Sequence, residues 1–375
     1  MKEYITNNYD IAEKRPKLRC ETKLLHSPVK GWSFAHHPCI TFFNGLFFVV
    51  FSNGRVNEDD VGQRIMVTTS SDFQTWTEPK PFIDSTMGLK KELVLDPGGF
   101  YIYNDTLNFY YSQFEYVDEW IEDGHRKPGN KGHTNTKTWC ITTKDGVNWS
   151  EPTFLSDTFY CNFPLKLHSG RLLYAGSTYH VYSDNPDGVH DWVLSGIYPK
   201  DMDTSRFVDD SAGIELVKEY TGRPVSLCEG SFIQTDDHVI HMMLRSGTDY
   251  QWVSESYDDG ESWTEPEPTL FTDNRTKSQF GRLPDGTYFY VGTPDPFPPR
   301  TRHVLALYLS KNGLNYDHHY LLQDAQYKAK FVGLDKNGIY GYPKTWIHDG
   351  YLYITVSICK ESIIAMRVLL DDLRI

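Results

Sequence analysis

Short apolar runs separated by polar turns recur along the whole chain. Residues 46–51, 106–112 and 351–357 are examples, each rich in aromatic and β-branched side chains. Such runs favour strands, and the Gly, Asn and Asp residues that bound them favour tight turns. Convincing helical periodicity is absent. The pattern predicts an all-β protein.

The runs group into six units with the same organisation. Each starts with a strand pair joined by a tight turn, such as Asn44-Gly45 in the first unit. The last unit lacks an outer strand, which residues 19–25 could supply, because joining the two termini closes the edges of a propeller. The units cover residues 39–82, 93–155, 160–217, 228–271, 278–322 and 342–373.

We therefore predict one six-bladed β-propeller domain over residues 1–375, with residues 1–30 completing the last blade. A seventh blade hidden in the divergent third unit is the alternative. The second unit also carries a polar, Gly-rich excursion at residues 115–136, and loops of that length are functional or mobile.

The turns form a repeat of their own. The clearest copy is 256–266, Ser-Tyr-Asp-Asp-Gly-Glu-Ser-Trp-Thr-Glu-Pro, and shorter versions occur at 70–76, 143–149 and 310–316. In such a turn the Asp binds backbone N–H groups, the Gly takes a left-handed φ and the aromatic ring closes over the loop. Three copies continue into Trp-Thr/Ser-Glu-Pro, which marks an internal repeat. The copy in the third unit is degenerate.

Composition and charge limit the possible partners. Aromatic residues make up 15% of the chain, which suits strands and sugar-binding surfaces. The net charge of −13 argues against a nucleic-acid or anionic-membrane partner. An anionic small substrate remains compatible, since a few local arginines outweigh a diffuse background.

No strong motif points to a metal or cofactor. His318-His319 and Asp258-Asp259 fit exposed turn residues, so we expect no cofactor, although a cation in the central channel is compatible with the sequence. The six cysteines lack a CxxC spacing and are expected to be mostly buried free thiols: Cys20, Cys39, Cys140, Cys161, Cys228 and Cys359.

The targeting signals expected of secreted or membrane proteins are not visible. No apolar run has transmembrane length, and residues 1–20 contain no apolar signal region. We expect a cytoplasmic protein, unless a leader has been removed; the oligomeric state is left open.

Together, the Asp turns, four-stranded units and Trp tails resemble the Asp-box (BNR-repeat) β-propellers of the sialidase superfamily, over nearly the whole chain. Glu229 in Cys-Glu-Gly-Ser-Phe, followed by Arg245, resembles the family's pair of a Glu that assists the nucleophile and an Arg that binds the substrate carboxylate. Arg302 resembles the next carboxylate-binding Arg, with Arg300 as the competing choice. Tyr342, in Gly-Tyr-Pro-Lys, resembles the nucleophilic Tyr.

The first unit matches only in part. Arg55 resembles an accessory substrate-binding Arg, and Asp60 or Asp59 the general acid. Sialidases begin this blade with Phe-Arg-Ile-Pro, whereas this chain has Ala-His-His-Pro, so His36 stands where the first of three arginines would be. Because strand neighbours alternate, we expect His36 to face the channel as a catalytic residue. His37 is then expected to pack outward, and it is kept as a substrate-binding candidate.

A titratable imidazole in place of a bidentate guanidinium disfavours ordinary sialidase activity. It resembles instead the propellers that act on uronic acid glycans, namely rhamnose–glucuronate lyases and hydrolases and ulvan lyases. The resemblance implies an enzyme that cleaves a glycosidic bond at an acidic, uronate-bearing sugar, by exo-acting hydrolase or lyase chemistry. Tyr342, Glu229 and Asp60 would serve a hydrolase; His36 or His37, with Arg245 and Tyr342, would serve a lyase.

Less specific interpretations stay open for the same residues. A single Arg at a strand end usually makes an inter-blade ion pair, a single Tyr usually packs, and Asp59 and Asp60 fit solvated surface charge. An exo-sialidase and a non-catalytic glycan-binding propeller are therefore the alternative functions.

Overall fold

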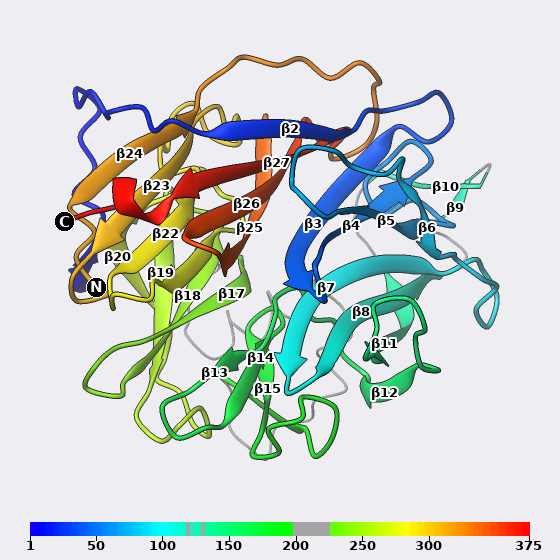
Figure 1. Cartoon of the computed structure of the whole chain (residues 1–375), viewed down its shortest axis with the longest axis horizontal. Helices are drawn as coiled ribbons and strands as arrows, with labels where there is room; N and C mark the ends of the chain where they lie inside the picture. The colour runs from blue at the N-terminus through cyan, green and yellow to red at the C-terminus, as the bar shows by residue number, and fades with distance from the viewer. Residues whose placement is uncertain (118–120, 123, 129–131, 198–225) are drawn as a thin grey trace.

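The computed structural model describes residues 1–117, 121–122, 124–128, 132–197 and 226–375. Six antiparallel sheets surround a common centre, which confirms the predicted six-bladed propeller (Figure 1). The described residues form no seventh sheet of this kind. Residues 198–217, assigned to the third unit from the sequence, lie outside the described residues.

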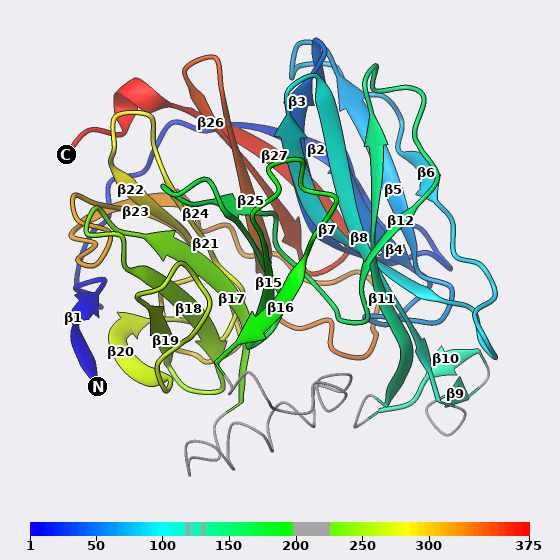
Figure 2. The same ribbon diagram turned by 90° about the horizontal axis from the view of Figure 1, so that it is seen from below.

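The first three blades are, from the innermost strand outward, β3 (Phe34–Phe43), β4 (Leu46–Gly54), β5 (Arg64–Ser70) and β6 (Lys80–Ile83); β7 (Val94–Tyr103), β8 (Thr106–Tyr116), β11 (His133–Thr143) and β12 (Thr153–Ser156); and β13 (Leu165–Lys166), β14 (Leu172–Ala175), β15 (Tyr179–Ser183) and β16 (Val193–Gly196). The excursion of the second blade holds a two-stranded hairpin, β9 (Ile121–Glu122) and β10 (His125–Arg126). Figure 2 shows this hairpin projecting at one side of the propeller.

The last three blades are β17 (Leu227–Gln234), β18 (Ile240–Ser246), β19 (Tyr250–Ser256) and β20 (Glu267–Thr272); β21 (Gln279–Arg282), β22 (Tyr288–Gly292), β23 (Leu305–Ser310) and β24 (His318–Gln323); and β25 (Tyr340–His348), β26 (Tyr351–Ile358) and β27 (Ser362–Leu369). The helix found among the described residues is a single 3₁₀ turn, η3 (Leu370–Asp372). No described helix has the length and apolar character needed to cross a membrane.

The N-terminal segment closes the ring at the sixth blade and also pairs with the fourth blade. Strand β2 (Glu21–His26) pairs antiparallel with β27 as the outer strand of the sixth blade, as predicted. Strand β1 (Lys2–Thr6) pairs parallel with β20 of the fourth blade, which the sequence did not indicate. Both chain ends lie on the same side of the molecule (Figure 1).

The Asp turns have the predicted internal bonds. Asp145 Oδ1 accepts hydrogen bonds from the N–H groups of Val147 and Asn148, at 2.8 and 2.7 Å. The hydroxyl of Thr143 accepts from the N–H of Gly146, whose φ is +77°. The turns that start at Ser70, Ser256 and Ser310 repeat this arrangement.

The third blade also has a working Asp turn, which the sequence reading treated as degenerate. Asp187 Oδ1 accepts from the N–H groups of Val189 and His190, at 2.7 and 3.0 Å, and Gly188 has a φ of +74°. Extra residues after Ser183 obscure the motif in the sequence, but the backbone pattern is the same as at Asp145.

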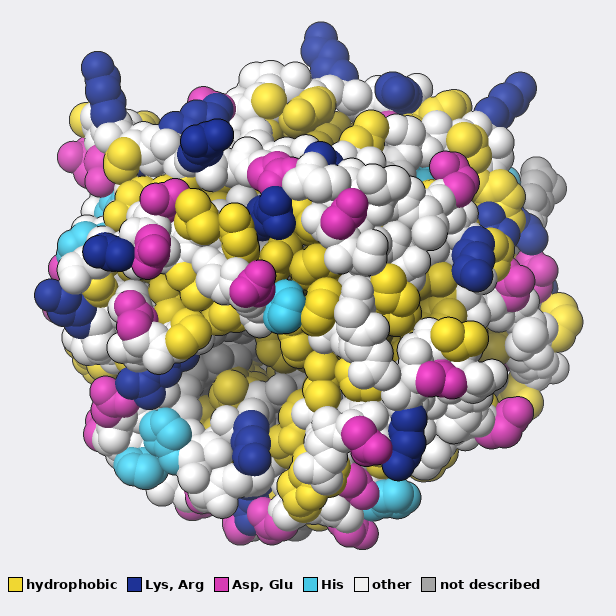
Figure 3. All heavy atoms as spheres, viewed as in Figure 1, with side chains coloured by type: hydrophobic (Ala, Val, Ile, Leu, Met, Phe, Trp, Pro, Cys, Tyr) yellow, Lys and Arg dark blue, Asp and Glu magenta, His cyan; other side chains and the backbone are white. Residues whose placement is uncertain are grey.

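The hydrophobic core lies between neighbouring blades. Val50 and Phe109 belong to one buried cluster shared by the first two blades, and Leu307 and Ile354 to another shared by the last two. The six cysteines are free thiols, with Cys20 and Cys228 half-buried and the others buried. On the face seen in Figure 3, Lys and Arg side chains are scattered among Asp and Glu.

The Asp turn of the third blade can be tested by Asp187→Ala. We expect the free energy of unfolding to fall by about 1 kcal/mol, because two backbone N–H groups lose their acceptor. Urea denaturation followed by tryptophan fluorescence measures the change. Asp157→Ala, at an exposed residue, is the control and should stay within about 0.5 kcal/mol of wild type; equal effects at both positions would contradict the assignment.

Candidate active site

All six blades contribute to one cavity at the end of the central channel. Its volume is about 560 Å³, within the range of small-molecule sites. Its walls combine cationic, acidic and aromatic side chains. The lining includes His37, Asp96, Tyr179, Glu229, Arg245, Arg302 and Tyr342, in blade order.

Bulges in the innermost strands turn key side chains into this cavity. The ladder between an inner strand and its neighbour is interrupted in β3, β7, β17 and β25. His37, Glu229 and Tyr342 occupy three of these interruptions, with φ values of +52°, +55° and +55°. Non-glycine residues seldom adopt such angles, and strain of this kind gathers at functional sites.

Glu229, Arg245 and Tyr342 form a hydrogen-bonded triad, as the predicted pairing implied. Arg245 Nη1 donates to Glu229 Oε2 at 2.8 Å and to the Tyr342 hydroxyl at 3.0 Å. The Tyr342 hydroxyl in turn donates to Glu229 Oε1 through a short hydrogen bond. The strand register explains the first contact, because Cys228 lies opposite Arg245 in the β17–β18 pair.

The triad has opposite effects on its two acidic groups. Burial alone would raise the pKa of Glu229, but Arg245 and the Tyr342 hydroxyl lower it to about 2. Burial and the negative charge of Glu229 raise the pKa of Tyr342 well above its usual value. The site therefore presents a neutral phenol to an ionised carboxylate.

Arg302 lies beside this triad with unused hydrogen-bond donors. Its side chain is 3% exposed, and its Nη2 donates to the carbonyl of Arg275 at 3.1 Å. Its Nε and Nη1 find no partner among the residues that the structure describes. Burial and the positive charge of Arg245 lower the pKa of Arg302. An anion placed between Arg245 and Arg302 would satisfy both, and Arg300 also lines the cavity.

The prediction that His36 faces the channel and His37 packs outward was wrong. His36 is fully buried beneath the cavity wall, with Nδ1 2.6 Å from the Ser357 hydroxyl. His37 lines the cavity, and its Nδ1 lies 2.8 Å from Asp96 Oδ1. The cause is the bulge at His37, which breaks the alternation of the strand. Burial would lower the pKa of His37, but Asp96 raises it overall.

The two histidines still border the predicted tyrosine. The ring centroids of His36 and His37 lie 4.2 and 5.1 Å from that of Tyr342.

Asp60 is a structural residue, so its assignment as general acid was wrong. Its carboxylate is fully buried and accepts hydrogen bonds from the N–H groups of Val56, Asn57 and Arg126. His125 Nδ1 lies 2.8 Å from the same carboxylate, which thus ties the β9–β10 hairpin to the first blade. Asp59, the alternative candidate for the general acid, lines the cavity instead.

Arg55 is also outside the cavity, which corrects its assignment as a substrate-binding residue. It forms an ion pair with Glu92 at 2.9 Å, and both side chains are more than a third exposed. This is the inter-blade ion pair that a single arginine at a strand end usually makes.

Sequence reasoning missed Asp96, Glu58 and Lys360, although one signal was present. In His37-Pro38, Asp96-Pro97 and Tyr342-Pro343, a cavity residue precedes a proline in an inner strand. Proline cannot donate to the ladder, so it is confined to interruptions such as bulges. Glu58 and Lys360 pair at 2.6 Å across the first and last blades, and no comparable motif marks them.

The wall contributed by the second and third blades is aromatic. Phe114, Phe159 and Tyr179 line it, and the ring of His133 stacks on Phe114 at 4.0 Å. The arginines that line the cavity come from the fourth and fifth blades. The cavity therefore has a cationic side and an aromatic side.

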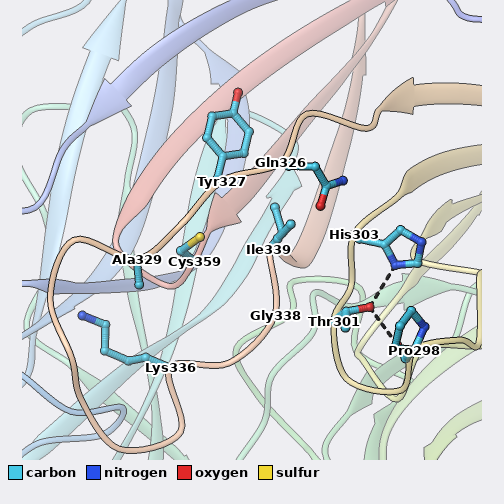
Figure 4. A pocket seen from close by; sticks show the side chains of 10 residues that line it. All are labelled: Pro298, Thr301, His303, Gln326, Tyr327, Ala329, Lys336, Gly338, Ile339 and Cys359. Atoms are coloured by element: carbon cyan, nitrogen blue, oxygen red, sulfur yellow. Dashed lines mark hydrogen bonds between the residues drawn. The ribbon is translucent and has the colours of Figure 1, made fainter.

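A second cavity, of about 430 Å³, lies between the fifth and sixth blades (Figure 4). Its one charged lining side chain is Lys336, whose Nζ is occupied by Glu361 and two carbonyl groups. The Thr301 hydroxyl bonds both the carbonyl of Pro298 and the ring of His303. This cavity lacks a catalytic constellation among the described residues.

The BNR repeat-like domain family matches residues 44–354. No curated protein sequence matches the chain significantly.

Among solved structures, a sialidase is similar with a TM-score of 0.61 and 18% identity, covering 94% of this chain and 33% of its own. A protein of unknown function from Dyadobacter fermentans has a TM-score of 0.61 and 14% identity, covering 94% and 100%. Trypanosoma rangeli sialidase in complex with sialic acid has a TM-score of 0.59 and 13% identity, covering 96% and 60%. At these identities the similarity establishes the fold, and the chain spans a third to 60% of the two sialidases.

The exchange of roles between Asp59 and Asp60 can be tested by paired variants. Asp60→Asn should lower the free energy of unfolding by about 2–3 kcal/mol, because an amide cannot accept all the bonds of the buried carboxylate. Asp59→Asn should change it by less than about 1 kcal/mol. Chemical denaturation of both variants gives the comparison, and a larger loss for Asp59→Asn would contradict the structure.

Proposed function

The chain belongs to the BNR repeat-like domain family, within the Asp-box propellers of the sialidase superfamily, and we propose that it cleaves a glycosidic bond at a sugar that carries a carboxylate. The observation that carries the proposal is the hydrogen-bonded triad of Glu229, Arg245 and Tyr342 beside Arg302, two of whose donors have no partner in the part of the chain that the structure describes. Such a set supplies a nucleophile, its base and a cationic clamp in one cavity.

The substrate carboxylate would bind between Arg245 and Arg302. A guanidinium presents parallel N–H donors that match the two oxygens of a carboxylate. Arg302 has two such donors without a partner among the described residues. The apolar face of the sugar ring would lie on the wall of Phe159 and Tyr179. A cavity of about 560 Å³ at the channel end fits a terminal sugar, hence exo action.

Hydrolysis would proceed with Tyr342 as nucleophile. The phenol oxygen forms a bond to the anomeric carbon while its proton passes to Glu229. The bond to the leaving oxygen breaks, and that oxygen takes a proton from an acid in the cavity, for which Asp59 is the candidate. Water then attacks the anomeric carbon, releases the sugar and restores the phenol.

Substrate binding would also activate the base. Arg245 holds the pKa of Glu229 low because its charge is directed at that carboxylate. A substrate carboxylate that shares Arg245 weakens this hold, and Glu229 becomes a better proton acceptor when the sugar is in place.

We place uronates first and sialosides second. His36 stands in the sequence where sialidases have an arginine, and its neighbour His37 supplies the side chain that lines the cavity there, so one of three fixed guanidinium groups is replaced by an imidazole. The carboxylate of a uronate is not on the anomeric carbon, so its binding depends less on a guanidinium at this position of the first blade. The similar solved structures include a sialidase in complex with sialic acid, which supports a sugar ligand in general.

Lyase chemistry is the second candidate, and the pair of His37 and Asp96 favours it. In a β-elimination a base removes the proton beside the uronate carboxylate, the bond to the neighbouring glycosidic oxygen breaks, and a C=C bond forms. His37 would take the proton, with Asp96 at 2.8 Å stabilising the imidazolium, and Tyr342 would protonate the leaving oxygen.

Turnover of two substrate sets tests the proposal: a fluorogenic sialoside and uronate-capped oligosaccharides. We expect cleavage of at least one, and a loss of about 10²-fold or more in kcat for Tyr342→Phe and Glu229→Gln, because the nucleophile or its base is removed. Tyr250→Phe, on an exposed strand residue, is the control. Ultraviolet absorbance of an unsaturated uronate would identify a lyase.

The outcomes separate the alternatives. Release of reducing sugar without new absorbance identifies a hydrolase, and release from the sialoside alone identifies an exo-sialidase. Sugar binding without any turnover would reject the enzyme and leave the glycan-binding propeller.

The carboxylate clamp predicts a dependence on substrate charge. Arg302→Ala should weaken binding of a uronic or sialic acid by about a hundredfold, and should hardly change binding of its methyl ester, because the ester lacks the charge. Isothermal titration calorimetry measures both. Arg55→Ala should match wild type. An equal loss for acid and ester would contradict the clamp.

A further inference from the structure

We propose that His36, His37 and Glu58 bind a divalent transition-metal ion, of which Zn²⁺ is the representative, next to Tyr342. One ligand atom from each of these residues lies within 4.8 Å of the others. The three come from the bulged part of β3 and from the loop after β4, so the fold itself brings them together. Nothing in the proposed cleavage chemistry accounts for the arrangement of His36 or Glu58.

His36 has a lone pair that lacks a partner. The Ser357 hydroxyl donates to the carbonyl of Gly341 at 3.1 Å, so its oxygen accepts the Nδ1 proton of His36 across 2.6 Å. This assignment leaves Nε2 as an unprotonated acceptor. His36 is fully buried, and its Nε2 has no hydrogen-bond partner among the described residues. A buried unpaired acceptor is costly, and a metal ion would satisfy it.

His37 is oriented in the same way. The Ser52 hydroxyl donates to the carbonyl of His36 at 3.0 Å, and the Nδ1 of His37 lies 2.8 Å from Asp96 Oδ1. Nδ1 therefore carries the proton toward the carboxylate, and Nε2 is directed away from it. A carboxylate behind a histidine is the usual support of a metal-binding imidazole, because it fixes the tautomer and the ring.

Glu58 completes the set from a fixed position. Lys360 Nζ holds its Oε1 at 2.6 Å, which leaves the second oxygen of the carboxylate for a metal. Bonds to Zn²⁺ are about 2.0–2.1 Å long, so ligand atoms around one ion lie roughly 3–4 Å apart. The ligand atoms of His36, His37 and Glu58 therefore have to approach one another by a small rotation of their side chains when the ion binds. Two imidazoles and one carboxylate suit Zn²⁺ or Co²⁺ and disfavour Mg²⁺ and Ca²⁺.

The ion would have a role in the proposed hydrolysis, and this step rests on that function; a metal ion on Nε2 of His37 would exclude that histidine as the base of the lyase alternative. The first blade has lost the guanidinium that would contact a substrate carboxylate, and a metal ion beside Tyr342 would restore a positive charge there. It would also leave an open coordination position for a substrate oxygen.

Metal binding to the full chain tests the inference without any substrate. Isothermal titration with ZnCl₂ should give one ion per chain, and CoCl₂ should give visible absorption typical of a low-symmetry site with nitrogen ligands. His37→Ala and Glu58→Gln should each weaken binding at least about tenfold, and Asp96→Asn by about 10- to 100-fold. The control is His303→Ala, in the second cavity, which should keep the wild-type affinity.

Three results would overturn the inference: no stoichiometric Zn²⁺ binding, affinity unchanged in His37→Ala and Glu58→Gln, or tighter binding of Ca²⁺ than of Zn²⁺. Circular dichroism verifies that each variant is folded, and Asp96→Asn, which leaves both imidazoles in place, replaces any variant that is not. Because the readout is binding, it separates the two proposals. Turnover by a chain that binds no metal refutes the metal site alone, and metal binding without turnover refutes the cleavage alone.

Discussion

The interrupted hydrogen-bond ladder of the innermost strands is the constraint on which the cavity depends. In an unbroken strand, neighbouring side chains alternate between the two faces and fill the contacts with adjacent blades. At His37, Glu229 and Tyr342 the chain instead adopts positive φ, at a cost of about 1–3 kcal/mol per residue. The apolar clusters between blades, such as the one around Val50 and Phe109, hold the ring against this strain.

Within that frame one guanidinium determines the charge state of the site. Arg245 contacts both Glu229 and Tyr342, so the carboxylate stays ionised and the phenol stays neutral. These contacts act over about 3 Å in a buried setting, where the net charge of −13 spread over the surface has little influence. A strongly acidic composition is therefore compatible with an anionic ligand at this site.

Sequence reasoning found what depends on strand pairing and missed what depends on backbone exceptions. Glu229 and Arg245 were predicted together from their resemblance to a Glu and Arg pair of the sialidase superfamily, and the β17–β18 pairing, in which Cys228 lies opposite Arg245, brings them into contact. The histidine and aspartate assignments each failed by one residue. His37 has a φ of +52° inside strand β3, which reverses the side-chain direction that alternation predicts; Asp59, with a φ of +54°, lies in the turn after β4, where the resemblance did not separate it from Asp60. The alternating pattern cannot report a positive φ at a residue other than glycine, although a following proline could have signalled His37.

The N-terminal segment helps the fourth and sixth blades to hold side-chain atoms about 3 Å apart. It pairs with β20 of the fourth blade through β1, meets Leu321 of the fifth blade near Lys17, and pairs with β27 of the sixth through β2. These are the blades that supply Arg245, Arg302 and Tyr342. A single covalent segment across their outer edges limits how far they can slide past one another, and the short contacts inside the ring require that. The segment that closes the propeller therefore also stabilises the geometry of the site.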